Sequence, residues 1–332
     1  MKIFNAKPLH QHHFHSLHFG FIDYFFVKRE SQQAPNFHRR MFDEDFSMLF
    51  SPRDSRSESL FDIVSNDYAL TQRLLGNVKT GYEQYTIDET IRELLEEVTQ
   101  SLIRSGRAFY SLYDDLDKEE THIVSFSSNG VVRLLGTQIH WIPRRRERHL
   151  GQDGEELLPR EVRILDSKKV MRFDMPKSIK RMLSIQNKTL SVLDKHKLGS
   201  INFQSQATYE NPNPSTHFDF RAWNDIQERA LCRATRSTGW NGRKYDSPNS
   251  SDFFYCHRLI RFRRNQLLLR DDILNQLSRE LSRVGKSYKV EFSVKILGSN
   301  ELPSITHLNE LEDRLEREQL GFTEIIDYCS NR

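Results

Sequence analysis

The sequence predicts an α+β protein in which antiparallel sheet segments are combined with several amphipathic helices. Three observations support this fold class. One segment, residues 87–105, has a clear helical period, and a series of short strand-like segments follows it with brief polar turns. Strands joined by such short turns pair antiparallel. In addition, helices and strands do not alternate regularly, as they would in a doubly wound parallel sheet.

The N-terminal sixty residues contain two segments of different character. Residues 19–26 are rich in aromatic side chains, and we expect them to form a strand of the core. Residues 30–58 mix proline, serine and charges, which is typical of a long loop or linker.

The helix at 87–105 is defined at both ends by its own residues. Thr86 and Glu89 have the spacing of a capping box, in which each side chain bonds the backbone of the other residue. Gly106 stands where a glycine commonly ends a helix in the left-handed conformation. The apolar positions between them recur on one face: 87, 91, 94, 95, 98 and 102.

The rest of the chain continues the mixture of strands and helices. Strands are predicted at 108–113, 121–126, 131–135, 137–142, 161–165, 168–173, 253–263 and 289–297. Helices are predicted at 176–198, 220–237, 269–284 and 307–320. Residues 200–217 contain two Asn-Pro steps and no period, so we place a boundary there, between an N-terminal domain at 1–199 and a basic C-terminal domain at 218–332.

Residues 66–115 resemble the body region of tailed-phage portal proteins. The resemblance is carried by the amphipathic helix at 87–105, by Gly106, and by the aromatic strand from Ala108 to Tyr113. It covers about fifty residues; the chain is short for a portal protein, and the sequence shows no clear pair of stem helices. The resemblance implies a ring oligomer with DNA passing through its centre and basic residues lining the tunnel. It implies no catalytic residues.

Composition excludes several classes of protein. No stretch approaches the roughly 18 uncharged apolar residues of a membrane span, and the N-terminus lacks the apolar core of a signal peptide. The three cysteines form no CxxC pair, which favours reduced thiols and a cytoplasmic location. Because the Gly-rich nucleotide motifs and the common hydrolase motifs are also missing, we expect no cofactor and lean against an enzyme.

Charge is unevenly distributed although the whole chain carries only +3. Residues 83–120 hold eleven acidic against four basic side chains, whereas 221–270 hold eleven basic against four acidic ones. Such a basic region is the electrostatic signature of a nucleic-acid surface. It is equally compatible with a charge match to acidic segments of the same or a neighbouring subunit, or with plain solvation.

The predicted phosphate contacts lie on the helix at 220–237 and the strand that follows. Arg229, Arg233 and Arg236 share one helical face. If 254–263 is a strand, Arg261 and Arg263 lie on one side with Tyr255, while Arg258 interrupts the apolar side and needs a partner. The proposed nucleic-acid contacts are Arg229, Arg233, Arg236, Trp240, Arg243, Lys244, Tyr255, Arg261 and Arg263, with Trp240 and Tyr255 as stacking platforms.

Two further patterns suggest metal chemistry. The strand at 161–165 is followed by Asp166 and Lys168, which have the Asp-x-Lys spacing of restriction-type nucleases, and Asp153 would be the upstream carboxylate. The histidine-rich segment near the N-terminus offers weak metal ligands in His13, His15 and His18.

The leading hypothesis is therefore a non-enzymatic assembly or interaction protein, with self-association or a protein partner and a nucleic-acid-facing surface at 221–270. A metal-dependent nuclease and a portal-like ring subunit remain alternatives.

Overall fold

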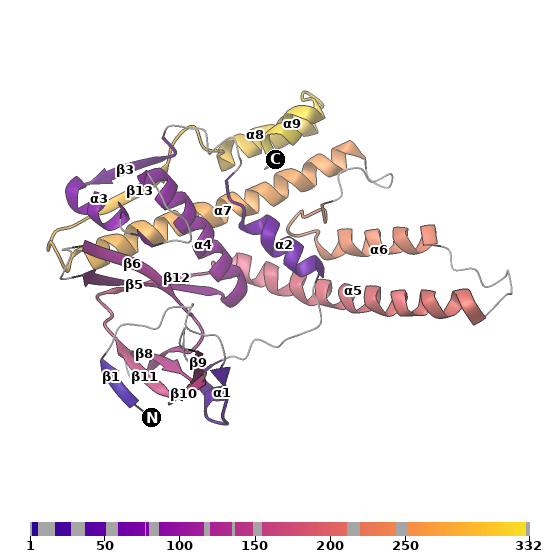
Figure 1. Ribbon diagram of the computed structural model, residues 1–332. Coiled ribbons are helices and arrows are strands. Elements are labelled where there is room, and N and C mark those ends of the chain that lie inside the picture. Colours follow the sequence, from indigo (N-terminus) through magenta and orange to yellow (C-terminus); the bar gives the residue numbers. More distant parts are fainter. Residues whose placement is uncertain are drawn as a thin grey trace. The chain divides into compact units, whose positions relative to one another are not determined.

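The structure, a computed structural model, describes residues 2–5, 17–27, 37–50, 59–76, 78–79, 86–115, 120–134, 137–148, 155–210, 220–243 and 251–329 (Figure 1). Its helices are α1 (Asp23–Phe26), α2 (Phe37–Ser47), α3 (Tyr68–Gly76), α4 (Ile87–Ser105), α5 (Lys177–Glu210), α6 (Phe220–Ala234), α7 (Asp252–Gly285), α8 (Ile305–Glu316) and α9 (Phe322–Cys329). Its strands are β1 (Lys2–Asn5), β2 (Leu17–His18), β3 (Phe61–Ser65), β4 (Val78–Lys79), β5 (Arg107–Asp115), β6 (Glu120–Phe126), β7 (Val131–Leu134), β8 (Thr137–Ile142), β9 (Arg144–Arg148), β10 (Glu155–Leu158), β11 (Glu161–Leu165), β12 (Val170–Asp174) and β13 (Val294–Gly298).

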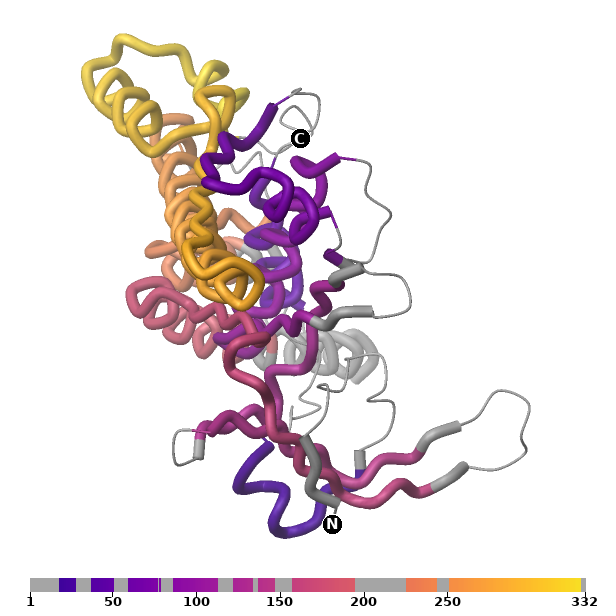
Figure 2. Tube along the Cα trace, turned by 90° about the vertical axis from the view of Figure 1, so that its left-hand side faces the viewer, coloured from indigo at the N-terminus to yellow at the C-terminus, as the bar shows by residue number. Residues whose placement is uncertain are grey.

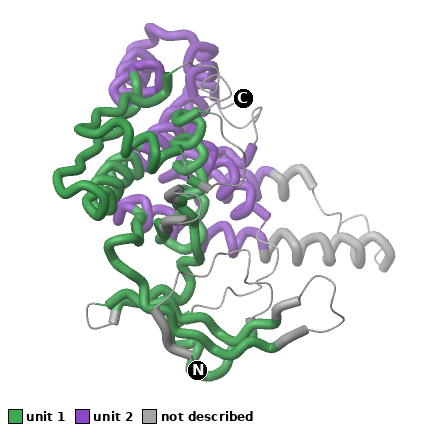
Figure 3. The backbone as a smooth tube through the Cα atoms, turned by 60° about the vertical axis from the view of Figure 1, so that its left-hand side comes forward, with its two compact units in different colours: residues 1–31, 59–175, 271–299 green, residues 32–58, 176–270, 300–332 purple. Residues whose placement is uncertain are grey.

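The chain divides into two compact units, coloured separately in Figure 3. Unit 1 contains residues 1–31, 59–175 and 271–299, and unit 2 contains 32–58, 176–270 and 300–332. The α+β class is confirmed. The units are interleaved along the sequence, whereas we had expected consecutive domains on either side of residues 200–217. One boundary between the units, at residues 270 and 271, lies within α7, and α5 continues to Glu210, into the segment 200–217 that we expected to be a loop.

Unit 1 contains the sheets, which are small and mostly antiparallel (Figure 1). Figure 2 shows the course of the same chain from another side. The strand orders are β1-β11-β8-β7, β10-β9-β2, β12-β5-β6-β4 and β13-β3. Only the pairs β1–β11 and β4–β6 are parallel among the described strands. A buried cluster joins strands of two sheets, and consists of Phe109, Phe126, Val131, Leu165 and Val170.

Helix α4 confirms the sequence prediction at both ends. The Thr86 hydroxyl accepts a hydrogen bond from the Glu89 amide at 3.2 Å, and the Glu89 carboxylate accepts one from the Thr86 amide at 3.1 Å. Gly106 adopts φ 76° and its amide bonds the carbonyl oxygen of Leu102. These caps satisfy backbone groups that the ends of an isolated helix leave without partners. The strand predicted after Gly106 is β5, so the elements behind the portal resemblance are present.

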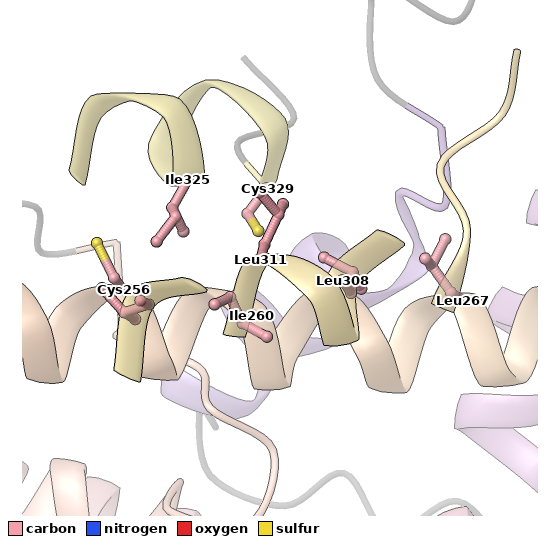
Figure 4. Close-up of a cluster of buried hydrophobic side chains, with 8 residues drawn as sticks. Cys256, Ile260, Leu267, Leu308, Leu311, Ile325 and Cys329 are labelled. Carbon is pink, nitrogen blue, oxygen red and sulfur yellow. The ribbon is translucent and has the colours of Figure 1, made fainter. Parts of the chain in front are cut away.

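Unit 2 is built from helices. Helix α5 packs against α2 and α6, and α8 and α9 pack on α7 through a cluster of buried residues (Figure 4). The cluster consists of Cys256, Ile260, Leu267, Leu308, Leu311, Leu315, Ile325 and Cys329. Burial raises the pKa of the Cys256 thiol to about 11 and that of Cys329 to about 12, so both thiols are protonated at neutral pH.

Several sequence predictions about local structure are wrong. The strand expected at 253–263 is part of the 34-residue helix α7, in which Cys256, Ile260 and Leu267 follow the helical period. The aromatic residues of 253–263 are typical of a strand. The segment is helical because the helix places its apolar side chains together on one face, where α8 and α9 bury them. The loop expected at 30–58 contains α2, because Phe42 and Phe46 lie one turn apart and are both buried.

A further correction concerns the N-terminus. Residues 19–26 form a turn and the short helix α1 rather than a core strand, and Phe21 and Phe25 are 80% and 72% exposed. The predicted strand at 289–297 begins only at Val294, since a turn closes with a bond from the Phe292 amide to the Lys289 carbonyl.

The described helices include none with the length and apolar character needed to cross a membrane.

A buried histidine makes the stability of unit 1 sensitive to pH. His140 on β8 is fully buried, and burial together with the charge of Arg163 lowers its pKa to about 3. In the unfolded chain the ordinary pKa is about 6.5, so below that pH the unfolded state binds the proton more strongly. Stability is therefore lost as pH falls from about 6.5 toward 3.

We predict that unit 1 loses roughly 2 kcal/mol of unfolding free energy between pH 7 and pH 5, because each unit below 6.5 costs about 1.4 kcal/mol. The variant His140→Asn, which does not titrate, should lose much less over the same range. Chemical denaturation at both pH values measures the difference. Equal pH dependence in the two proteins would contradict the assignment to His140.

Candidate interaction surface: an arginine-rimmed groove

A turn at residues 235–240 connects α6 to the rest of unit 2 and is fixed on two sides. The Thr238 hydroxyl donates a hydrogen bond to the side-chain oxygen of Gln186 on α5. On the other side, Arg258 of α7 donates to the Thr235 hydroxyl at 2.7 Å and to the carbonyl oxygen of Trp240. The turn is therefore held between α5 and α7.

Gly239 allows this turn to approach α7 closely. Its φ is 82°, and a Cβ at this position would lie 2.3 Å from the carbonyl oxygen of Arg258 and 2.8 Å from the amide of Phe262. Only glycine fits such a position without displacing backbone. The close approach brings Arg261 of α7 to the end of α6, where its guanidinium donates to the carbonyl oxygen of Arg236 at 3.0 Å.

The three helices enclose an open groove of about 650 Å³. Its apolar lining comes from α5 and α6, and guanidinium groups come from α6, the turn and α7. The lining residues are Ile185, Thr189, Leu193, Ala230, Arg233, Ala234, Arg236, Ser237 and Arg261. We call this feature the arginine-rimmed groove.

The arginines of the groove are available to a partner. Arg233, Arg236 and Arg261 are exposed, and so is Arg229 one turn before Arg233 on α6. Within the part of the chain that the structure describes, no carboxylate lies within ion-pairing distance of Arg229, Arg233 or Arg236. The groove thus combines unpaired positive charge with aliphatic side chains.

Two other residues predicted to bind nucleic acid form contacts within the chain: Trp240 is buried, and Arg243 is exposed but paired with carboxylates. Trp240 is 2% exposed, and its indole donates to Asp45 at 2.7 Å with its ring edge-on to Phe42, so it offers no stacking surface. Arg243 donates to Asp45 at 2.8 Å and to Glu44 at 3.0 Å. The hydrogen bond with Asp45, aided by Glu44, raises the pKa of Arg243 above its ordinary value.

Arg263 is also internal. It is 1% exposed and donates to the carbonyl oxygen of Leu49 at 2.8 Å, so it cannot reach a phosphate. Tyr255 is half-buried on α7. Arg258 is buried too, and desolvation lowers its pKa. The sequence predicted that Arg258 needs a partner, and the structure provides the backbone carbonyls of Cys232 and Trp240 and the hydroxyl of Thr235. Lys244 lies outside the described residues.

The metal-dependent alternatives gain no support from the described residues. The Asp166 carboxylate accepts the amide of Lys168 at 3.0 Å, which closes the exposed turn between β11 and β12. Asp153, His13 and His15 lie outside the described residues, and His18 is on β2. Among the described side chains, no three His, Cys, Asp or Glu residues are grouped to hold a metal ion.

No protein-family model matches the sequence, and no curated protein is significantly similar to it. Among solved structures, similar chains come from "Neck of empty GTA particle computed with C6 symmetry" (TM-score 0.41, 10% identity, 87% of each chain) and "Virion of native gene transfer agent (GTA) particle" (0.40, 10%, 88% of each). Another comes from "Neck of native GTA particle computed with C12 symmetry" (0.35, 10%, 88% of each). These neighbours are chains of multi-subunit particles. Likeness at this level assigns neither a fold family nor a function to this chain.

The closeness of Gly239 to α7 gives a prediction for stability. Gly239→Ala should destabilise unit 2 by at least about 2 kcal/mol, because it adds a left-handed alanine, costing roughly 1–2 kcal/mol, to a backbone clash. Gly321→Ala in the same unit is the matched control, since nothing lies within 4 Å of its added Cβ. Thermal unfolding measures both. If Gly239→Ala is no less stable than Gly321→Ala, the turn does not need its observed approach to α7.

Proposed function

We propose that the protein is a non-enzymatic assembly or interaction protein that uses the arginine-rimmed groove to bind an anionic partner. The observation that carries this proposal is that three exposed arginines, Arg233, Arg236 and Arg261, surround the aliphatic side chains that form the floor of the groove. Guanidinium groups bind carboxylates and phosphates through directed, charge-assisted hydrogen bonds.

The floor of the groove favours an acidic amphipathic protein segment over a nucleic acid. Ile185, Leu193, Ala230 and Ala234 present aliphatic surface, which is stabilised by covering it with apolar side chains. A nucleic acid would offer hydrated phosphates there, and the lining residues that the structure describes include no aromatic ring on which a base could stack. A helix that carries leucines on one face and glutamates beside them matches both parts of the groove.

Nucleic acid is the second candidate, and a specific observation supports it. Arg229 extends the row formed by Arg233 and Arg236 along α6, and all three lack carboxylate partners among the described residues. Such a row of cations can follow a phosphate backbone without reading its sequence.

A binding experiment separates the two partners. A fluorescently labelled helical peptide of leucine and glutamate should bind the full chain at about 50 mM salt and more weakly at about 300 mM. Changing Arg233, Arg236 and Arg261 together to alanine should weaken binding about tenfold, because each exposed ion pair contributes roughly 0.2–1 kcal/mol and the three together about 0.6–3 kcal/mol.

The control is Arg279→Ala, which removes a 70%-exposed arginine outside the groove and should leave binding unchanged. A circular-dichroism spectrum checks that the triple variant is folded. A short DNA duplex is titrated in parallel. If the duplex binds tightly and the triple variant abolishes this binding, the partner of the groove is nucleic acid. If neither probe binds at low salt, the proposal is overturned.

A further inference from the structure

Four apolar side chains at the N-terminal turn are exposed together. Phe21, Ile22, Tyr24 and Phe25 are 80%, 49%, 52% and 72% exposed, and the rings of Phe21 and Phe25 meet edge to face at 5.4 Å. We call these four residues the aromatic patch. A large aromatic side chain buries about 150–250 Å² when it is fully covered, so the three rings expose on the order of 400 Å². An apolar area of this size is comparable to the largest patch on a typical monomer, and such a patch is often functional.

The turn that carries the aromatic patch is held rigidly by a buried ionic network. Asp23 is 0% exposed and accepts four hydrogen bonds: from the Gly20 amide at 2.7 Å, from the Trp141 indole at 2.8 Å, and from two guanidinium nitrogens of Arg160 at 2.7 and 2.8 Å. Burial acts to raise the pKa of the Asp23 carboxyl, but these hydrogen bonds outweigh it and hold the pKa below its usual value.

The same network separates the inward from the outward side chains of the turn. Phe26 stacks on Trp141 at 4.2 Å, and Val27 is buried with them, so these residues anchor the turn to the sheet. Within the aromatic patch, Tyr24 reaches this packing through the ring of Phe19 at 5.9 Å, whereas Phe21 and Phe25 contact each other on the outer side. A turn fixed in this way keeps its exposed rings preorganised, which lowers the entropic cost of binding.

We propose that the aromatic patch is a twofold interface through which two copies of the chain associate. The patch carries no charged side chain, because Asp23 is buried and paired with Arg160, so two patches can meet without bringing like charges together. Two such patches facing each other cover on the order of 1,000 Å², which reaches the size expected of a specific but weak interface. An apolar surface is complementary to itself, and twofold contacts are the commonest mode of self-association.

The chemistry of the interface follows from its residues. Aromatic side chains are enriched in the central parts of protein interfaces, and Tyr24 can keep its hydroxyl at the wet edge while its ring is covered. This interface is independent of the arginine-rimmed groove, so either proposal can fail without the other.

Sedimentation velocity of the full chain tests the interface. Between about 1 and 100 µM the protein should change from monomer to dimer, as expected for a weak interface. Phe21→Ser combined with Phe25→Ser should raise the dissociation constant about 100-fold, since two large apolar side chains lose their burial. Tyr68→Ser is the matched control, because it removes a 58%-exposed aromatic outside the patch and should leave the dimer unchanged.

Two measurements distinguish this interface from other contacts. In a Cys232→Ser background, Ile22→Cys keeps the three rings of the patch and should form a disulfide-linked dimer under mild oxidation, because so small a twofold interface keeps the two copies of residue 22 near its axis. The triple groove variant should dimerise like the wild type. A chain that stays monomeric throughout, dimers insensitive to the Phe21 and Phe25 changes, or loss of dimers only in the groove variant would overturn the proposal.

Discussion

An arginine can be buried only if its guanidinium finds hydrogen-bond acceptors inside the protein, and α7 buries three arginines in unit 2, Arg258, Arg263 and Arg270. Arg258 draws the turn after α6 onto the helix by bonding Thr235 and the Trp240 carbonyl, and Arg263 binds the carbonyl oxygen of Leu49. Gln266 adds hydrogen bonds to the carbonyl oxygens of Asp45 and Met48. Polar groups of α7 thus fix the segments around it, and the arginine-rimmed groove lies where they meet.

The same principle explains which arginines remain outside. Arginine side chains that face a backbone carbonyl or a carboxylate form bonds within the protein, as Arg243 does with Glu44 and Asp45. In the groove between α5, α6 and α7, Arg233 and Arg236 have no carboxylate partner among the described residues, and Arg261 donates only to the Arg236 carbonyl, so all three side chains stay at the surface. The basic character of residues 221–270 therefore has two components, one structural and one available for binding.

The sequence predicted those elements whose signals are local. The capping box and Gly106 located α4 correctly, because hydrogen bonds within a few residues define its ends. It failed where burial by distant segments decided the outcome. Residues 254–263 carry aromatic side chains suited to a strand, but α8 and α9, about fifty residues later, cover them as a helix. The sequence also identified Arg233, Arg236 and Arg261 as surface cations, while the burial of Trp240 and Arg263 depends on α2, which it did not anticipate.

Two of the three cysteines are buried, which leaves Cys232 as the thiol that a labelling reagent can reach most easily. Cys256 and Cys329 are protonated and enclosed in the cluster under α8 and α9, whereas Cys232 is partly accessible on α6, next to Arg233. A thiol-reactive dye added at neutral pH would label this one position in preference to the other two. The folded protein can thus carry an environment-sensitive reporter beside its groove without any engineered residue.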